Sequence, residues 1–340
     1  MNKKDADDIM TNQKNLSPVV IFVYKRVLHT KNLLMSLAGC DLADQTEVYI
    51  YSDGPKRSVD KDDVDKVRTL IKEKQWQDVF AKVTIFESEI NKGLANSIIS
   101  GASEVIEKYG KVLVLEDDLI VAPYYLKYMN QALDAFENQE NIFAVAGWTY
   151  PINRLKNYKK DAWLHYRPCS WGWGTWLDRW DQVIWDPEEA EFEKKLNDSE
   201  WRRKFDRAGN DLAPMLRRQL DGKSDSWAIR WTANQTEKEM LAVFPKYPVV
   251  YDDGRDGSGT HAHADNQEYD RKDNGNDLKM FIDKTFCHSK DSYDFSDIVL
   301  DELLIKSAWN YDSDTIWKKF KRNSKKIFVE HKIPDFLKKK

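Results

Sequence analysis

The stretch that decides the fold is VLVLEDDLIV, residues 112–121, in which three consecutive acids interrupt an apolar run. The acids are Glu116, Asp117 and Asp118. Burying an unpaired carboxylate costs several kcal/mol, so either a cation lies beside these side chains or the strand ends there, at a surface or a cleft. We therefore expect a buried strand over 112–115 that delivers the acids to its end.

Strand-like and helix-like segments alternate before this stretch. Apolar runs predict strands at 18–24, 47–51 and 82–86, and helical spacing predicts helices around 33–38, 64–71 and 93–109. Such alternation indicates right-handed βαβ units and a mostly parallel sheet, an α/β fold. Ligands of such sheets bind outside the carboxyl ends of the strands, where Arg26, Asp53 and the acidic triplet are expected.

Composition narrows the class of protein. The 340 residues are 41% hydrophobic and 32% charged, with a net charge of −4, as in a soluble globular protein without a general affinity for nucleic acid. The three cysteines form no CxxC motif or disulfide framework, which favours a reducing compartment. Because the N-terminal residues are polar and no apolar run is long enough for a membrane span, we expect a cytoplasmic protein.

The pattern changes after about residue 150, where Trp-rich segments, loops and charged helices replace the alternation. We divide the chain into a flexible lead-in (1–16), a nucleotide-sugar-binding α/β half (17–150), an acceptor-side and catalytic part of the same domain (151–265) and an extension (266–340). The extension ends in a basic, partly apolar tail. Such a tail is typical of segments that contact anionic membranes, and equally of a helix packed against the catalytic domain.

Consecutive carboxylates at a strand end suit a hard divalent cation such as Mn²⁺ or Mg²⁺. The chain contains no GxxxxGK[ST] motif, and no GxGxxG follows the first strand. The two commonest nucleotide-binding modes of a doubly wound sheet are therefore not indicated.

Seven short motifs together resemble GT-A-type nucleotide-sugar glycosyltransferases, similar to the N-acetylglucosaminyltransferase I-like group and its bacterial sugar-transferase relatives. They are VVIFVYKR (19–26), YIYSDGPK (49–56), NKGLANSI (91–98), LVLEDDLIV (113–121), CSWGWGTWLDRW (169–180), SDSWAIRW (224–231) and DGRDGSGTH (253–261). The resemblance implies a Rossmann-like GT-A fold, with a Trp-rich acceptor side and a helical basic C-terminal tail added to it.

The resemblance also implies roles in binding the donor. Arg26 would meet the donor diphosphate, and Asp53 would accept a hydrogen bond from the uracil N–H. Gly93, Leu94, Ala95 and Asn96 would line the nucleoside, with Gly93 allowing close approach of the backbone. Glu116 and Asp117 would face the ribose and the donor sugar, and the loop of Gly257, Ser258, Gly259 and Thr260 would fold over the diphosphate.

Metal binding and catalysis are assigned in the same way. Asp118 would bind the metal, together with His261, for which simple exposure is the alternative. Asp225 falls at the position of the catalytic base; the alternative is an N-cap of the helix beginning near Trp227, with Asp221 as the next candidate base. Trp171 and Trp173 would form the wall for the sugar and acceptor.

These assignments predict a bacterial, metal-dependent, inverting glycosyltransferase of polysaccharide biosynthesis. It would move a sugar from a UDP-sugar, with UDP-GlcNAc as a candidate, to a glycan or lipid-linked glycan. The basic tail would contact the inner face of the membrane.

Two other classes of protein stay open. A glycoside hydrolase also uses two carboxylates in a Trp-lined cleft, and a non-catalytic sugar- or nucleotide-binding protein would use its acids only for structure.

Overall fold

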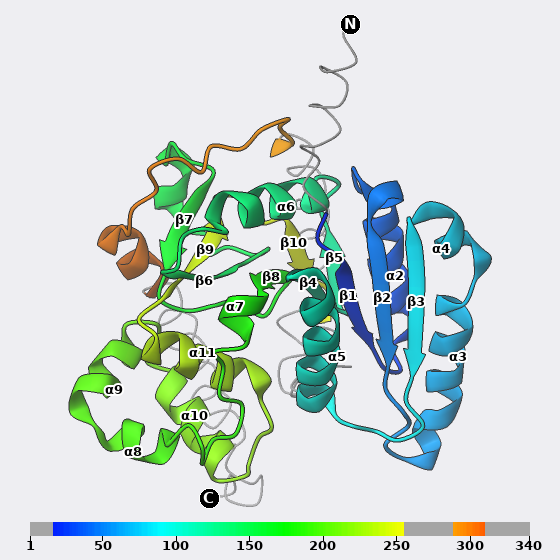
Figure 1. The fold of residues 1–340 in the computed structure, drawn as a ribbon, viewed down its shortest axis with the longest axis horizontal. Helices are drawn as coiled ribbons and strands as arrows, with labels where there is room; N and C mark the ends of the chain where they lie inside the picture. The colour runs from blue at the N-terminus through cyan, green and yellow to red at the C-terminus, as the bar shows by residue number, and fades with distance from the viewer. Residues whose placement is uncertain (1–15, 255–287, 310–340) are drawn as a thin grey trace, which may run out of the picture.

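The computed structural model describes residues 16–254 and 288–309. Its centre is an eight-stranded mixed sheet with the order β3-β2-β1-β4-β8-β6-β9-β7 (Figure 1). The strands are β1 (Val19–Val23), β2 (Glu47–Ser52), β3 (Lys82–Glu87), β4 (Lys111–Glu116), β6 (Ile142–Val145), β7 (Ala162–His165), β8 (Trp173–Trp176) and β9 (Leu241–Pro245). The predicted lead-in up to residue 15, the loop of Gly257 to His261 and the basic tail lie outside the described residues.

The first four strands of the sheet are parallel and agree with the sequence prediction. β1 pairs in parallel with β2 and with β4, and β2 pairs in parallel with β3. The connecting helices are α2 (Val27–Ala38), α3 (Lys61–Ile71), α4 (Lys74–Val79) and α5 (Leu94–Tyr109). Helix α5 lies close against the sheet because Gly101 has no side chain; a Cβ there would be 2.8 Å from the ring of Phe22.

The other half continues the same sheet with mixed strand directions. β8 runs antiparallel to both β4 and β6, β9 is parallel to β6, and β7 is antiparallel to β9. The helices of this half are α6 (Tyr125–Phe136), α7 (Leu177–Trp180), α8 (Phe192–Asn197), α9 (Ser199–Asp206), α10 (Leu212–Leu220) and α11 (Trp227–Glu237). The described residues also contain the short 3₁₀ helices η1 (Ala43–Gln45), η2 (Ser58–Asp60) and η3 (Asn153–Asn157).

The tryptophans of this half are mainly core residues, and the prediction for Trp173 is wrong. Its side chain is 0% exposed, and its ring centroid lies 4.6 Å from that of Trp231 and 5.2 Å from that of Trp227. β8 lies in the interior of the sheet, between β4 and β6, and all four of its residues are buried. Trp173 therefore packs under α11 and cannot line an open acceptor wall.

The apolar residues after the acidic triplet form a second, small sheet. β5 (Leu119–Val121) pairs antiparallel with β10 (Val250–Asp252), and Leu119 lies opposite Asp252. β4 ends at Glu116, so Asp117 and Asp118 form the turn between the two sheets. The last strand residue and the turn that follows it therefore carry the three acids, between two strands that are mostly buried.

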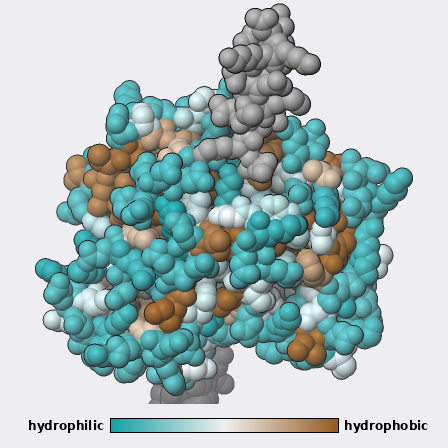
Figure 2. All heavy atoms as spheres, in the orientation of Figure 1, coloured by the Kyte–Doolittle hydropathy of each residue, from teal (hydrophilic) through white to brown (hydrophobic). Residues whose placement is uncertain are grey.

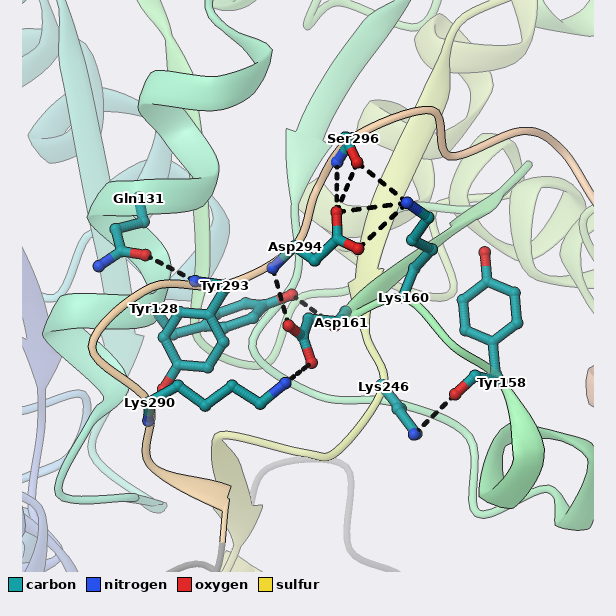
Figure 3. Close-up of polar contacts among 10 residues, drawn as sticks. All are labelled: Tyr128, Gln131, Tyr158, Lys160, Asp161, Lys246, Lys290, Tyr293, Asp294 and Ser296. Atoms are coloured by element: carbon teal, nitrogen blue, oxygen red, sulfur yellow. Dashed lines mark hydrogen bonds and ion pairs between the residues drawn. The ribbon is translucent and has the colours of Figure 1, made fainter.

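Residues 288–300, called the strap here, return to the outer edge of the large sheet (Figure 3). Asp161 accepts hydrogen bonds from Lys290 Nζ at 2.5 Å and from the backbone N–H of Asp294 at 2.8 Å. Tyr293 packs edge-on to Tyr128 of α6, with a centroid distance of 4.9 Å. The strap is therefore bound to α6 and to the residue before β7 by aromatic and polar contacts.

The face of the molecule in Figure 2 is mostly hydrophilic, with apolar side chains scattered over it. Among the helices of the described ranges, none has the length and apolar character needed to cross a lipid bilayer.

Candidate active site

Arg26 and two acids of the triplet meet where adjacent parallel strands end. Arg26 follows β1, which lies between β2 and β4 in the sheet. Its Nη2 donates to Asp118 Oδ2 at 3.0 Å and also to Asp117. The expectation of a cation beside the acids is thus confirmed, and that cation is a side chain from the neighbouring strand end.

The carboxylates of this cluster nevertheless outnumber its positive charges. Burial, with added repulsion from Asp118 and Asp117, raises the pKa of Glu116 to about 8. Burial also raises the pKa of Asp117, although Arg26 opposes that shift. Burial alone would lower the pKa of Arg26, but Asp117 and Asp118 raise it, so the guanidinium stays charged. Without a further cation, Glu116 therefore favours its protonated form at neutral pH.

Two more acids, Asp252 and Asp253, enter the site from the end of β10. The N–H of Asp253 donates to the carbonyl oxygen of Asp118 at 2.8 Å, and the carboxylate of Asp252 contributes to the raised pKa of Glu116. A ring nitrogen of His29 lies 3.2 Å from the Asp253 carbonyl oxygen. Neither acid was predicted to belong to the site, although Asp253 begins the motif DGRDGSGTH and the apolar run before Asp252 repeats the pattern of the triplet.

Gly254 closes the cluster against the carboxylate of Asp118. A Cβ at Gly254 would lie 2.3 Å from Asp118 Oδ2 and 2.9 Å from Asp118 Cγ. The N–H of Gly254 donates to Asp252 Oδ1 at 2.9 Å, which fixes this turn. The space beside Asp118 is therefore shaped by a residue without a side chain.

The carboxylate oxygens of this cluster are ligands of the kind that hard divalent cations prefer. Mg²⁺ and Mn²⁺ prefer carboxylate oxygens, and Mg²⁺ often takes only one or two from the protein, with water and substrate phosphate completing the set. Asp118 and Glu116 are the partly accessible acids of the triplet, whereas Asp117 is buried; the side chain of Asp118 is 23% accessible. Within residues 16–254 and 288–309, no three His, Cys, Asp or Glu side chains are grouped to hold a metal ion by themselves.

Asp53 organises the loop on the other side of the site. Its Oδ1 accepts hydrogen bonds from the N–H groups of Gly54 at 2.9 Å and Lys92 at 2.8 Å, and its Oδ2 accepts from Gly93 N–H at 3.0 Å. A carboxylate can accept about four hydrogen bonds, so one position remains at Oδ2. The predicted hydrogen bond from a uracil N–H would use that position and stays a prediction.

The segment predicted to line the nucleoside divides into accessible and inaccessible parts. Gly93 precedes α5 with a φ of +78°, and a Cβ there would meet no atom within 4 Å, so its surroundings are open. Leu94 is 39% exposed, and Asn96 is exposed as well. The prediction that Ala95 lines the nucleoside is wrong, because this residue is 1% exposed and its methyl group packs in the core below the helix. On α5 it falls on the buried face, beside Ile98.

Asp225 lies just before α11, with its side chain 59% exposed. Arg230 Nη2, from the same helix, donates to Asp225 Oδ1 at 3.0 Å. The alternative of a helix cap is wrong, because the N-cap is Ser226, whose hydroxyl accepts from the N–H of Ile229. Asp221, the second candidate base, ends α10 and pairs with Lys223 at 2.8 Å.

Trp171 differs from Trp173 because it precedes β8 and is only partly buried. Its ring lies perpendicular to that of Trp148, with a centroid distance of 5.0 Å. The two indoles form one wall of a cavity, and the acceptor role predicted for Trp171 remains a prediction.

No protein-family model matches the chain. Over 89 residues, it is 28% identical to the alpha-1,3-mannosyl-glycoprotein 2-beta-N-acetylglucosaminyltransferase of Arabidopsis thaliana. That relative is named as an N-acetylglucosaminyltransferase, as the motif resemblance predicts. The match covers 23% of this chain and 20% of the relative, so it concerns one segment of each protein.

Solved structures align over about half of the chain. TarS of S. aureus (residues 1–349) aligns with a TM-score of 0.36 and 15% identity, over 51% of each chain. The mannosyltransferase PcManGT of Pyrobaculum calidifontis, in complex with GDP-Man and Mn²⁺, aligns with a TM-score of 0.33 and 12% identity, over 52% of this chain and 51% of its own. Because these scores are low, the α/β architecture rests on this chain's own strand order.

Proposed function

We propose that the protein is a metal-dependent, inverting glycosyltransferase with a UDP-sugar donor. The observation that carries this proposal is the meeting of Arg26 with Asp117 and Asp118 at adjacent parallel strand ends, beside an acid-rich turn from β10. A nucleoside diphosphate needs both a cationic partner and a metal-binding carboxylate, and this cluster offers both. The motif resemblance and the curated relative support the same class of reaction.

Arg26 would contact the donor diphosphate. Its Nη2 is engaged by the two aspartates, whereas its Nη1 is buried and has no hydrogen-bond partner among the described residues. A buried guanidinium N–H without an acceptor is unfavourable, and an anion is a strong acceptor for it. A phosphate oxygen of the donor would satisfy Nη1.

Asp118 would hold the cation, with the space against Gly254 setting the position of its carboxylate. When bound, a divalent cation would neutralise the negative charge that develops on the diphosphate as it leaves. Asp53 and the open backbone at Gly93 would position the nucleoside on the opposite side of the site.

Asp225 would act as the general base. An exposed carboxylate can accept the proton of an acceptor hydroxyl as that oxygen attacks the donor sugar. Arg230, with only 10% of its side chain accessible, would hold the carboxylate in place through the 3.0 Å contact. A single displacement with one base inverts the configuration of the transferred sugar.

Calorimetric titration of UDP into the protein, with and without Mn²⁺, tests this function. We expect Mn²⁺-dependent binding of UDP and turnover of a UDP-sugar in a panel that includes GDP- and dTDP-sugars. Asp118→Asn preserves the shape of the side chain but removes its charge, so both signals should fall to background. Asp78→Asn is the matched control, because exposed Asp78 lies on α4, which precedes β3 and therefore sits at the opposite end of the sheet.

Unchanged UDP binding and turnover in Asp118→Asn, or in excess EDTA, would contradict the metal assignment. Hydrolysis of glycosides without any nucleotide would instead favour the hydrolase class. Metal-dependent UDP binding without turnover on any acceptor would favour a binding protein.

A further inference from the structure

The loops that follow β2 and β3 are joined to each other at the ends of these two parallel strands. The N–H of Gly54 donates to the carbonyl oxygen of Ile90 at 3.2 Å, and Asn91 Nδ2 donates to the carbonyl oxygen of Gly54 at 2.8 Å. A Cβ at Gly54 would lie 2.5 Å from the carbonyl carbon of Ile90. Because Gly54 has no side chain, the two loops can pack backbone against backbone.

Arg68 of α3 links the same two loops through its guanidinium group. Nη2 donates to the carbonyl oxygens of Ser88 at 2.6 Å and Asp53 at 3.4 Å, and Nε donates to Ser52 Oγ at 3.3 Å. Ser52 is the last residue of β2, and Ser88 is the first residue after β3. Because the donors of a guanidinium group have a fixed planar arrangement, these bonds fix the spacing between the two strand ends.

This spacing sets the direction of the Asp53 carboxylate. Of the three N–H groups that donate to it, that of Gly54 belongs to the loop after β2, whereas those of Lys92 and Gly93 belong to the loop after β3. A displacement of one loop relative to the other would turn the carboxylate away from its present direction. Arg68 therefore acts on the carboxylate of Asp53 through the backbone of the two loops.

We infer that Arg68 sets the selectivity of the site for the nucleobase, as a positioning residue that holds Asp53 in its direction. The inference rests on the function proposed above, in which Asp53 positions the nucleoside. A carboxylate without a proton only accepts hydrogen bonds. It can therefore accept from N3–H of uracil, whereas N3 of cytosine would face it with a lone pair and leave both acceptors without a donor.

UDP and CDP test this inference, because they share the ribose and the diphosphate and differ only at the edge of the pyrimidine. Calorimetric titration with Mn²⁺ gives the ratio of the two affinities, and we expect the wild-type protein to favour UDP by roughly tenfold or more. Arg68→Met keeps a long side chain but removes its donors, so this ratio should fall by at least roughly fivefold. A merely destabilised protein would bind both nucleotides more weakly and keep the ratio.

Lys72→Met is the matched control. Lys72 directly follows α3, and its Nζ pairs with Glu87, the last residue of β3, at 2.7 Å. It links the same helix to the same strand as Arg68 does, but through a side chain of the strand rather than through the loops, so the ratio should stay that of the wild-type protein. Arg68→Lys carries the test if Arg68→Met does not fold. It keeps the positive charge but not the planar set of donors, so the ratio should fall by about twofold or more.

Asp53→Asn tests the contact with the base separately, because the amide replaces one acceptor oxygen by a donor and should lower the same ratio. Equal affinity of the wild-type protein for UDP and CDP, an unchanged ratio in the folded Arg68 variants, or an equal fall in Lys72→Met would overturn the inference. A ratio that falls in Asp53→Asn but not in the Arg68 variants would refute the role of Arg68 and leave the proposed function standing. Absence of any Mn²⁺-dependent UDP binding by the wild-type protein would refute the proposed function as well.

Discussion

At the scale of single residues, substitutions of Gly254 and Asp225 can test the candidate chemistry without disturbing the fold. A Cβ at Gly254 would first meet the side chain of Asp118, from Oδ2 at 2.3 Å to Cβ at 3.0 Å, and not a residue of the hydrophobic core, and the side chain of Asp225 is exposed. Changes at either position should therefore leave the core intact. A loss of function in these variants can be attributed to the site itself.

Gly254→Ala should displace the carboxylate of Asp118, because the added methyl group would lie 2.3 Å from Oδ2. We expect Mn²⁺-dependent UDP affinity to fall by roughly tenfold or more, as when a ligand-orienting group is lost, while the melting temperature changes little. Gly39→Ala is the control, since its Cβ would meet only ordinary contacts at 3.5 Å or more. Equal UDP affinity in the two variants would show that Gly254 does not position Asp118.

Asp225→Asn should lower turnover by roughly 10²–10⁴, the range for loss of a general base, with UDP binding unchanged. The amide oxygen can still accept from Arg230, so the local structure is preserved. Asp221→Asn serves as the control four residues earlier. If Asp221→Asn loses turnover and Asp225→Asn does not, the base has been assigned to the wrong aspartate; retention of configuration in the product would remove the single-base mechanism.

At the scale of elements, the strap shows how an outer segment is attached to the sheet edge (Figure 3). Two ion pairs link it to the segment before β7, Asp161 with Lys290 and Lys160 with Asp294. They differ in burial, because the side chain of Asp161 is 10% accessible whereas that of Asp294 is 48% accessible. Only the first pair should contribute strongly to stability.

Asp161→Ala should lower the free energy of unfolding by about 1–3 kcal/mol, because it removes the acceptor of the Asp294 N–H as well as the partner of Lys290. Lys160→Ala should cost less than about 1 kcal/mol, as expected for an exposed pair. Urea denaturation followed by tryptophan fluorescence compares the two. Equal losses would mean that the strap is not anchored through Asp161.

At the scale of the whole molecule, one sheet joins the two halves of the candidate active site. β8 pairs with β4 on one side and with β6 on the other, so the acidic turn and the Trp-lined cavity belong to one continuous layer. The second half is thus part of the same sheet as the first. We therefore expect the free energy of unfolding of the whole molecule to change when a titratable group in either half changes its charge.

Buried His165 and partly accessible Glu116 should give opposite pH dependences of the free energy of unfolding. Burial lowers the pKa of His165 to about 3, so its contribution to stability is present above about pH 6.5 and is lost as the pH falls toward 3. Burial raises the pKa of Glu116 to about 8, so its contribution is present below about pH 4.5 and is lost as the pH rises through 8. Relative to wild type, His165→Gln should gain stability with acidification and Glu116→Gln with alkalinisation, each by at most about 1.4 kcal/mol per pH unit.

Unfolding free energies measured from pH 4 to 8 in metal-free buffer would check these signs. Parallel profiles for both variants and the wild-type protein would contradict the shifted pKa values of the two groups.

The sequence by itself determined the parallel half of the fold and the meeting of Arg26 with the acids. Apolar runs that end in charged residues are local signals, and parallel strand order then brings their carboxyl ends together. For that reason the strands from Val19 to Glu116 could be predicted with the side chains that follow them.

Only the tertiary structure decided which residues of the second half face a ligand. Trp171 and Trp173 are two positions apart, yet one lines a cavity and the other is buried, because β8 begins at Trp173 in the interior of the sheet. The pairing of β10 with β5, 129 residues apart at the register of Val250 with Val121, adds Asp252 and Asp253 to the triplet. Such contacts depend on packing between distant segments, whereas sequence patterns report only the burial of neighbouring residues.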